Sequence, residues 1–312
     1  MIESNTASDA AAPSPDRPRI LLVDLSAVFW WKWHAAAGQP VDTAFEFTVG
    51  KVHSLAAEFD LVAVCCDARS FRYDLDPQYK GTRPPRDPVA LEQLARVKTA
   101  LTEQNFALLI CDGFEGDDII ATAVYQASQQ PVRPEIVIAG MDKDLLALIS
   151  PLVSMLHLQT GNVITSADVV KKTGVEPHQV RDFLVLVGDS SDNIKGVPGV
   201  GPKHAARLLK EFGTIDNLWQ MLDQEDASGS PVVKPESIRK SLLASAGAID
   251  LARKLVTLRT DAPIDVLASV RLHQPPARPT VAPTEPAPPL EEATTPVLPP
   301  GAVSTTQGAY TP

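Results

Sequence analysis

Four short apolar runs in the first half of the chain each lead into an acidic residue, and this arrangement constrains the fold more than any other feature. The runs cover residues 20–23, 61–66, 107–111 and 136–139, and the acids that follow them are Asp24, Asp67, Glu115 and Asp142. Each run has the length and composition of a buried strand. Because the carboxyl ends of strands in an open α/β sheet border one crevice, we expect the four acids to converge on one pocket.

Helical patterns alternate with these runs and then replace them. The expected strands are 18–24, 61–66, 107–111 and 135–139, and the expected helices are 42–58, 88–104, 115–128 and 142–149. This alternation predicts a mostly parallel sheet flanked by helices on both faces, extended by a short strand at 151–157 and a hairpin through 160–162. From residue 166 onward we expect only helices, at 166–173, 177–187, 202–212, 215–222 and 235–258. The predicted fold class is α/β with a C-terminal all-helical subdomain.

Nine acidic residues belong to the predicted cluster: Asp24, Asp67, Glu115, Asp117, Asp118, Asp142, Asp144, Asp189 and Asp192. Carboxylates a few ångströms apart raise one another's proton affinity, so they need cations to stay ionised together. Oxygen ligands in this number suit Mg²⁺ or Mn²⁺. Acids at the start of a helix also cap free N–H groups, which by itself would explain segments 113–118 and 141–144. Four strand ends that all finish in carboxylates favour a metal site over four coincident caps.

The segment from Gly188 to Lys203 has the makeup of a helix-hairpin-helix phosphate clamp. Gly196, Gly199 and Gly201 permit a tight hairpin that exposes backbone N–H groups, and the helix that follows offers its own free N–H groups to an anion. Such a clamp holds a nucleic-acid backbone without reading bases. A P-loop is excluded because Pro202 stands where that motif needs Lys.

The formal net charge of −10 is only weak evidence against a nucleic-acid partner. Nine of the 38 acidic residues belong to the predicted site, where bound cations would neutralise much of their charge. Basic residues, by contrast, gather at 69–86 and 195–210. Nucleic-acid binding therefore remains open on charge alone.

Composition also predicts the cellular location, the state of the cysteines and the disorder of the terminal segments. No apolar run is long enough to span a membrane, and residues 1–17 lack signal-peptide features, so we expect a cytoplasmic protein. Cys65, Cys66 and Cys111 lie in predicted strands, which favours buried reduced thiols. Residues 1–17 and the Pro-rich residues 273–312 are expected to be disordered, with a Pro-rich docking peptide as the alternative for the second segment.

Taken together, the motifs resemble a known family from about residue 18 to residue 270. They are Asp24, Asp67, Phe71-Arg72, Tyr79-Lys80 with Arg83-Pro-Pro85, Glu115 with Asp117-Asp118, residues 140–144, and Gly188-Asp-Ser-Ser-Asp-Asn-Ile194. In type, order and spacing they resemble the 5′-nuclease domain of bacterial DNA polymerase I and its stand-alone relatives, the flap endonuclease superfamily. The resemblance implies a structure-selective 5′-3′ exonuclease and flap endonuclease that acts on DNA in replication and repair.

The resemblance also implies a domain organisation and a site. A PIN-like catalytic domain would cover 18–165 with an arch at about 69–90, and a helical subdomain with the hairpin clamp would cover 166–272. Two divalent metals, Mg²⁺ or Mn²⁺, would be bound, the first by Asp24, Asp67, Glu115 and Asp117 with Asp118 nearby, the second by Asp142, Asp144, Asp189 and Asp192. Lys80 would be the catalytic lysine, beside the catalytic carboxylates of Asp24 and Asp117. Its ammonium would offset charge that builds on the phosphate.

Contacts to DNA are implied along the arch and the hairpin. Basic and aromatic residues of the arch would offer phosphate contacts and stacking surfaces: Arg69, Phe71, Arg72, Tyr73, Tyr79, Lys80, Arg83 and Arg86. In the hairpin, Gly196, Gly199, Gly201 and Lys203 would hold the duplex, with K⁺ bound by backbone carbonyls. We expect a monomer that relies on a separately encoded DNA polymerase and ligase.

Several positions depart from the family pattern. Leu25 stands where the family commonly has Gly, Trp31 where it has Arg, and Lys195 and His204 where it has Pro and Thr. The aromatic cluster Phe29-Trp-Trp31 with Trp33 is either a core contact or a wedge that stacks on bases at the duplex junction. Two alternative functions remain: a non-catalytic DNA-junction binding protein, and a PIN-like ribonuclease, which would lack the clamp and the arch.

Overall fold

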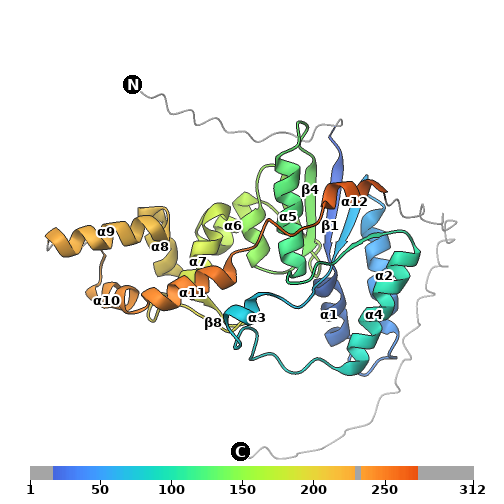
Figure 1. The fold of residues 1–312 in the computed structure, drawn as a ribbon, viewed down its shortest axis with the longest axis horizontal. Coiled ribbons are helices and arrows are strands. Elements are labelled where there is room, and N and C mark those ends of the chain that lie inside the picture. The colour runs from blue at the N-terminus through green and yellow to red at the C-terminus, as the bar shows by residue number, and fades with distance from the viewer. Residues whose placement is uncertain (1–16, 229–232, 273–312) are drawn as a thin grey trace, which may run out of the picture. The chain divides into compact units, whose positions relative to one another are not determined.

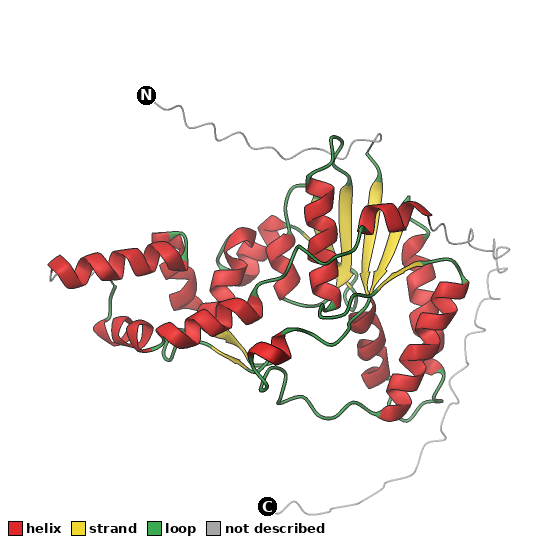
Figure 2. Cartoon of the chain, in the orientation of Figure 1, coloured by secondary structure: helices red, strands yellow, loops and turns green. Residues whose placement is uncertain are grey.

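The computed structural model describes residues 17–228 and 233–272. Of the two segments expected to be disordered, 1–17 and 273–312, all residues except Arg17 lie outside the described residues. A six-stranded sheet forms the centre of the first half, in the order β3-β2-β1-β4-β5-β6. Figure 2 shows strands of this sheet between helices. The strands are β1 (Arg19–Asp24), β2 (Leu61–Cys65), β3 (Ala107–Leu109), β4 (Glu135–Gly140), β5 (Val153–His157) and β6 (Val163–Ile164). The first five are parallel and β6 is antiparallel, which confirms the predicted sheet.

Helices cover both faces of this sheet. One face packs against α1 (Leu25–Ala35), α2 (Thr43–Ala56) and α4 (Pro88–Glu103), and the other against α5 (Gly116–Ser128), η1 (Asp144–Leu148) and α12 (Val266–Leu272). In Figure 1, α5 lies to the left of the strands and α2 and α4 to the right. Leu21 and Val23 of β1 point to the first layer, and Ile20 and Leu22 to the second. Continuous burial along β1, with side chains covered on both faces of the sheet, is typical of a parallel sheet.

Cys65 lies in β2 as predicted, whereas Cys66 and Cys111 follow the ends of β2 and β3. Cys65 and Cys66 are buried free thiols, and Cys111 is a partly buried free thiol just after β3. Burial raises the pKa of Cys66 to about 12 and that of Cys65 well above its usual range. Both thiols therefore stay protonated and act as core side chains.

The second half is helical, with one small exception. Its helices are α6 (Ser166–Thr173), η2 (Pro177–Gln179), α7 (Val180–Val187), α8 (Pro202–Phe212), α9 (Ile215–Ser228), α10 (Glu236–Ala244) and α11 (Ala246–Val256). Between α7 and α8, the strands β7 (Gly188–Asp189) and β8 (Ile194–Lys195) form an antiparallel ribbon that the sequence did not indicate. The single helix predicted at 235–258 is two helices that meet at Ser245.

After α11 the chain returns to the sheet, which the sequence did not predict. Residues 257–265, here called the return segment, run back toward α5, and α12 then packs against α5, β2 and β3. A short helix, α3 (Arg72–Leu75), lies beside α11 (Figure 1). In the parts of the chain that the structure describes, no helix has the length and apolar character needed to cross a bilayer.

Candidate metal and DNA site

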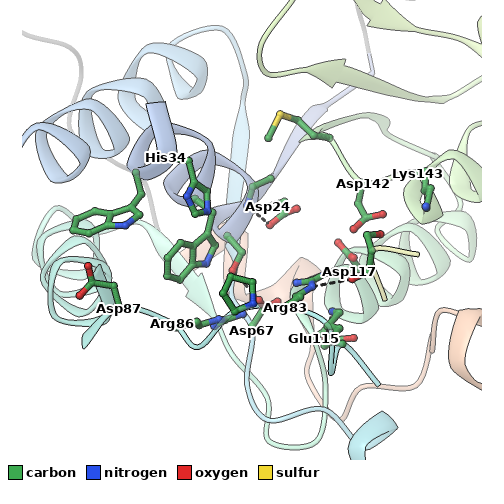
Figure 3. Close-up of a pocket in the computed structure, with 18 of the residues that line it drawn as sticks. Asp24, His34, Asp67, Arg83, Arg86, Asp87, Glu115, Asp117, Asp142 and Lys143 are labelled. Atoms are coloured by element: carbon green, nitrogen blue, oxygen red, sulfur yellow. Dashed lines mark hydrogen bonds and ion pairs between the residues drawn. The ribbon is translucent and has the colours of Figure 1, made fainter. Parts of the chain in front are cut away.

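Carboxylates from four strand ends line one cavity of about 970 Å³. They belong to Asp24, Asp67, Glu115, Asp117 and Asp142. The convergence follows from the register, because Asp24 lies level with Cys65 of β2 and Val23 lies level with Ala139 of β4. Figure 3 shows Asp24, Asp117 and Asp142 around a common space.

Several of these acids also cap helices, so capping and clustering coexist. Asp24 is the N-cap of α1 and accepts a hydrogen bond from the Ala27 amide at 2.9 Å. Glu115 and Asp118 form a capping box at the start of α5. Asp142 accepts from the Asp144 amide at 3.2 Å. Asp24 and Asp142 each give a single oxygen to these bonds, and the other oxygen remains for the cavity.

The crowding of these carboxylates shifts their titration. Burial, together with Asp67 and Asp142, raises the pKa of Asp24 to about 7. Burial and the neighbouring Asp142, Asp24 and Asp67 raise the pKa of Asp117 well above its usual range. Such groups resist being ionised together unless a cation lies among them.

A second group lies next to the first. Asp144, Asp189 and Asp192 place carboxylate oxygens within 4.8 Å of one another. One oxygen of Asp144 is buried and has no hydrogen-bond partner among the described residues, and burial followed by Asp142 raises the pKa of Asp144. A buried oxygen without a partner requires an explanation, such as a bound ion. Because every donor here is a carboxylate oxygen, the group fits Mg²⁺ or Mn²⁺.

Basic side chains face these carboxylates. Lys80 hydrogen-bonds to Glu115 and lies 3.9 Å from Asp192, and Arg83 donates to Asp192 at 2.7 Å. Lys143 donates to Asp189 at 2.5 Å. Burial opposes the charge of Lys80, yet Glu115 and Asp192 raise its pKa above the usual range, so it remains an ammonium.

The backbone directs Lys80 to this position. Lys80 adopts a left-handed conformation with φ of 54°, which is uncommon for a residue with a Cβ atom. Its own amide donates to the Asp192 carbonyl at 2.9 Å. Residues 69–90, the segment expected to form the arch, are therefore anchored at Lys80 to the loop that carries Asp189 and Asp192.

The hairpin glycines serve different purposes. A Cβ atom on Gly196 would lie 2.2 Å from the Val187 backbone, so Gly196 is required by close packing on α7. Gly199 has a φ of +81°, which a turn residue with a side chain rarely adopts. Gly201 is the N-cap of α8, and Lys203 is exposed in its first turn.

Two family models match adjacent parts of the chain. The model of the 5′-3′ exonuclease N-terminal resolvase-like domain matches residues 19–174, and that of the 5′-3′ exonuclease C-terminal SAM fold matches residues 175–278. The chain belongs to the 5′-3′ exonuclease family. The family expected from the sequence motifs is thereby confirmed.

Comparisons with individual proteins agree with this family assignment. The chain is 36% identical over 256 residues to a thermostable DNA polymerase I of Thermus thermophilus. This match covers 80% of the chain but only 29% of the length of the polymerase. It is 33% identical over 212 residues to a 5′-3′ exonuclease of Aquifex aeolicus (strain VF5), covering 67% of this chain and 68% of that protein. The crystal structure of a bacteriophage T5 D15 flap endonuclease complex with DNA and metal ions has a similar fold. Its TM-score is 0.64 at 22% identity, and the match covers 81% of this chain and 93% of that one.

Two arch residues of this exonuclease-family chain correct the sequence interpretation. Arg72 and Tyr79, predicted to contact DNA, are each only 2% exposed. The Tyr79 hydroxyl lies 2.9 Å from both Glu115 and Asp192, and it bridges the two carboxylate groups. Neither side chain is accessible to a phosphate or a base, because their polar atoms bind other parts of the protein. Arg69, by contrast, is exposed and pairs with Asp74 on the surface.

Asp118 also corrects the prediction, since it is not placed as a metal ligand. Its side chain is fully buried, and both oxygens accept two hydrogen bonds. One oxygen accepts from Arg72 at 2.8 Å and from the Arg259 amide at 2.9 Å. The other accepts from Arg72 at 2.7 Å and from the Glu115 amide at 3.1 Å. Asp118 is the counter-ion of Arg72.

An aromatic wall, defined as Trp30, Trp33 and His34 with Arg86, lines the same cavity. The Arg86 guanidinium lies 5.2 Å from the Trp30 ring. In Figure 3, His34 and Arg86 lie on the opposite side of the view from Asp142 and Lys143. Trp31, the position singled out by the sequence, instead packs edge-on against Phe47 of α2. The i, i+3 spacing of Trp30 and Trp33 on one helix face is a sequence signal that would have separated them from Trp31.

Proposed function

We propose that the protein is a structure-selective 5′-3′ exonuclease and flap endonuclease that hydrolyses phosphodiester bonds in DNA with two divalent ions, Mg²⁺ or Mn²⁺. The observation that carries this proposal is a cavity lined by the first group of carboxylates together with Lys80 and Arg83. The second carboxylate group, Asp144, Asp189 and Asp192, lies next to it. Membership of the 5′-3′ exonuclease family supports it. The related fold of a flap endonuclease complexed with DNA and metal ions is consistent with it.

The two carboxylate groups would each hold one ion. We assign Asp24, Asp67, Glu115 and Asp117 to the first ion and Asp142, Asp144, Asp189 and Asp192 to the second. Ions held by these residues would supply Lewis-acid chemistry, namely polarisation of the scissile phosphate, activation of a water and stabilisation of the leaving oxygen. Asp67 also fixes the geometry of the site, because its oxygens accept from Ser26 at 2.7 Å and from the Gly116 amide at 2.9 Å.

Lys80 and Arg83 would stabilise charge on the phosphate. Both line the cavity and both are paired with carboxylates of the site. A cation held beside the reacting phosphate stabilises negative charge that grows in the transition state. The left-handed backbone at Lys80 keeps its ammonium directed at Glu115 rather than at solvent.

DNA would approach from two directions. We propose that the hairpin from Gly196 to Lys203 holds the duplex by its backbone amides, with a K⁺ ion at its carbonyls. Arg69 and Arg86 would meet the single strand under the arch, and Trp30 and Trp33 would stack on its unpaired bases. The cellular role would be removal of primers or flaps in the cytoplasm, by a monomer working with a separate polymerase and ligase.

A flap-cleavage assay with Mg²⁺ tests this proposal. We expect wild-type protein to release a 5′ flap near the single-strand to duplex junction, and EDTA to stop the reaction. An Asp142→Asn, Asp144→Asn double variant should bind the flap yet cut at least about 100-fold more slowly. An Asp112→Asn, Asp250→Asn double variant makes the same change of charge at exposed positions and should cut at the wild-type rate.

The other readings predict different outcomes. Binding of flap DNA without cleavage of any flap, nick or gap would indicate a junction-binding protein. Cleavage of RNA alone would indicate a ribonuclease. Wild-type cutting by the Asp142→Asn, Asp144→Asn variant would contradict the two-ion assignment.

A further inference from the structure

Arg72 lies buried at the base of the arch and joins three parts of the chain. Its guanidinium donates to Asp118 at 2.7 and 2.8 Å and to Glu115 at 3.0 Å. It also donates to two carbonyls near the end of α11, those of Leu255 at 2.7 Å and Thr257 at 3.0 Å. All three guanidinium nitrogens are therefore engaged inside the protein.

These bonds converge on the first turn of α5, which carries part of the carboxylate site. Asp118 pairs with Arg72 through two parallel bonds, the geometry that is most specific for Arg and carboxylate. Glu115 accepts from Arg72 and Tyr79 on one oxygen and from Lys80 on the other. The orientation of Glu115 is thus set by three residues of one arch segment.

The return segment extends this attachment along α5. Asp118, Thr122 and Gln126 recur every four residues, so they share one face of the helix. Thr122 accepts from the Ala262 amide at 3.2 Å. Gln126 donates to the Ile264 carbonyl at 2.8 Å and accepts from the Val266 amide at 3.0 Å. The end of α11 and the return segment are therefore fixed to the helix that begins the metal site.

We propose that Arg72 is a positioning residue for the reaction. It holds Glu115 and the first turn of α5 in the orientation that a divalent ion needs, and it makes this orientation depend on the end of α11 in the helical half. This inference rests on the proposed two-ion function. Substitution of groups that orient metal ligands without touching the metal commonly lowers metal affinity or activity by about 10- to 100-fold.

Substitution Arg72→Lys tests the proposal with the charge retained. A lysine ammonium cannot reproduce both bonds to Asp118 together with bonds to two carbonyls. We expect a folded protein, with unchanged far-ultraviolet circular dichroism, that binds Mn²⁺ about 10- to 100-fold more weakly by paramagnetic resonance titration. The kcat for a flap substrate should fall by at least about tenfold, while KM changes little. Arg96→Lys is the matched control, because Arg96 of α4 forms an exposed ion pair with Asp42. It should leave the Mn²⁺ affinity and the kcat unchanged.

A second variant decides the outcome if Arg72→Lys does not fold. Asp118→Asn keeps the shape of the side chain but removes one of the two acceptor oxygens that Arg72 uses, so Mn²⁺ affinity should fall in the same direction. Wild-type Mn²⁺ affinity in a folded Arg72→Lys or Asp118→Asn protein would overturn the proposal. Mn²⁺ binding is measured without DNA, so failure of wild-type protein to cut a flap would contradict the proposed function separately.

Discussion

At the scale of single residues, one side chain often has two roles in this site. One oxygen of Asp24 caps α1 and the other faces the cavity, where burial and Asp67 raise its pKa and so disfavour its negative charge. Substitutions that separate the two roles should therefore separate folding from catalysis.

Asp24→Asn should make the metal-free protein more stable and much less active. The amide oxygen can still accept from Ala27, while the charge that burial and Asp67 disfavour is gone. Because the folded-state pKa of Asp24 is raised to about 7, the penalty of the ionised group is absent at low pH, grows as pH rises toward 7 and is complete above it. We expect a higher Tm in EDTA at pH 8, a smaller gain at pH 5, and cleavage reduced by about 100-fold or more.

The comparison variant is Asp24→Ala, which removes the charge and the cap together. Loss of an N-cap costs about 0.5 to 2 kcal/mol, so its Tm in EDTA should lie below that of Asp24→Asn. Equal Tm values for the two variants would show that the cap contributes nothing.

Lys80→Met should reduce the rate of cleavage by about 100-fold or more while flap binding changes little. The ammonium faces Glu115 and Asp192, and loss of one preorganised charge stabiliser commonly costs this much. Single-turnover cleavage and a binding titration with Ca²⁺ in place of Mg²⁺ would separate the two effects. Lys51→Met on α2, which does not line the cavity, is the control. A variant with a raised KM and an unchanged kcat would contradict a catalytic role for Lys80.

At the scale of elements, α1 gives the cavity a side that the family motifs did not indicate. If Trp30 and Trp33 stack on unpaired bases, Trp33→Ala should weaken binding of a 5′ flap by about 1 to 3 kcal/mol and leave binding of blunt duplex unchanged. The ratio of the two dissociation constants measures this. Trp219→Ala, on α9, should change neither ratio nor cleavage position, although it will lower stability. An unchanged ratio in Trp33→Ala would assign the aromatic wall to packing alone.

The elements also show what the sequence could predict. Strands β1, β2 and β4 were readable because each is a continuous apolar run, and the acids at their ends were readable because parallel strands share one edge. The seven-residue helix α12 was not, since a helix this short depends on packing for its stability. Arg72 and Asp118 were misassigned because a buried ion pair looks like two surface charges until its partners are known, and those partners lie as far away as Leu255. The break at Ser245 lies two residues before Gly247, which is the one local signal in the sequence that could have indicated it.

The attachment of the return segment to α5 should be measurable. Gln126→Leu leaves the Ile264 carbonyl and the Val266 amide without their side-chain partners, which should cost about 1 to 3 kcal/mol of unfolding free energy. Urea unfolding would report the loss. Gln129→Leu, at the exposed end of the same helix, serves as the comparison and should change stability by less than about 0.5 kcal/mol.

At the scale of the whole molecule, a chain with a net charge of −10 is proposed to hold polyanionic DNA. Divalent ions resolve the conflict, because they would neutralise the acids concentrated in the cavity. We expect Mg²⁺ to raise the Tm in calorimetry, by an amount that corresponds to about 2.7 kcal/mol when the ion is present at 100 times its Kd. NaCl of matched ionic strength should not do so, and the Asp142→Asn, Asp144→Asn variant should respond less. Equal responses to both salts would contradict specific ion binding.

The return of the chain to its first sheet has a consequence for how the protein is made. Thr122 of α5 binds the amide of Ala262, which is 140 residues further along the chain, and α12 covers strands that are synthesised far earlier. During translation, the surface of the first half that α12 covers therefore stays exposed until the helical half has left the ribosome. We therefore expect a nascent chain that stops before residue 257 to have no competent nuclease site, so that cutting begins only when both halves have been translated.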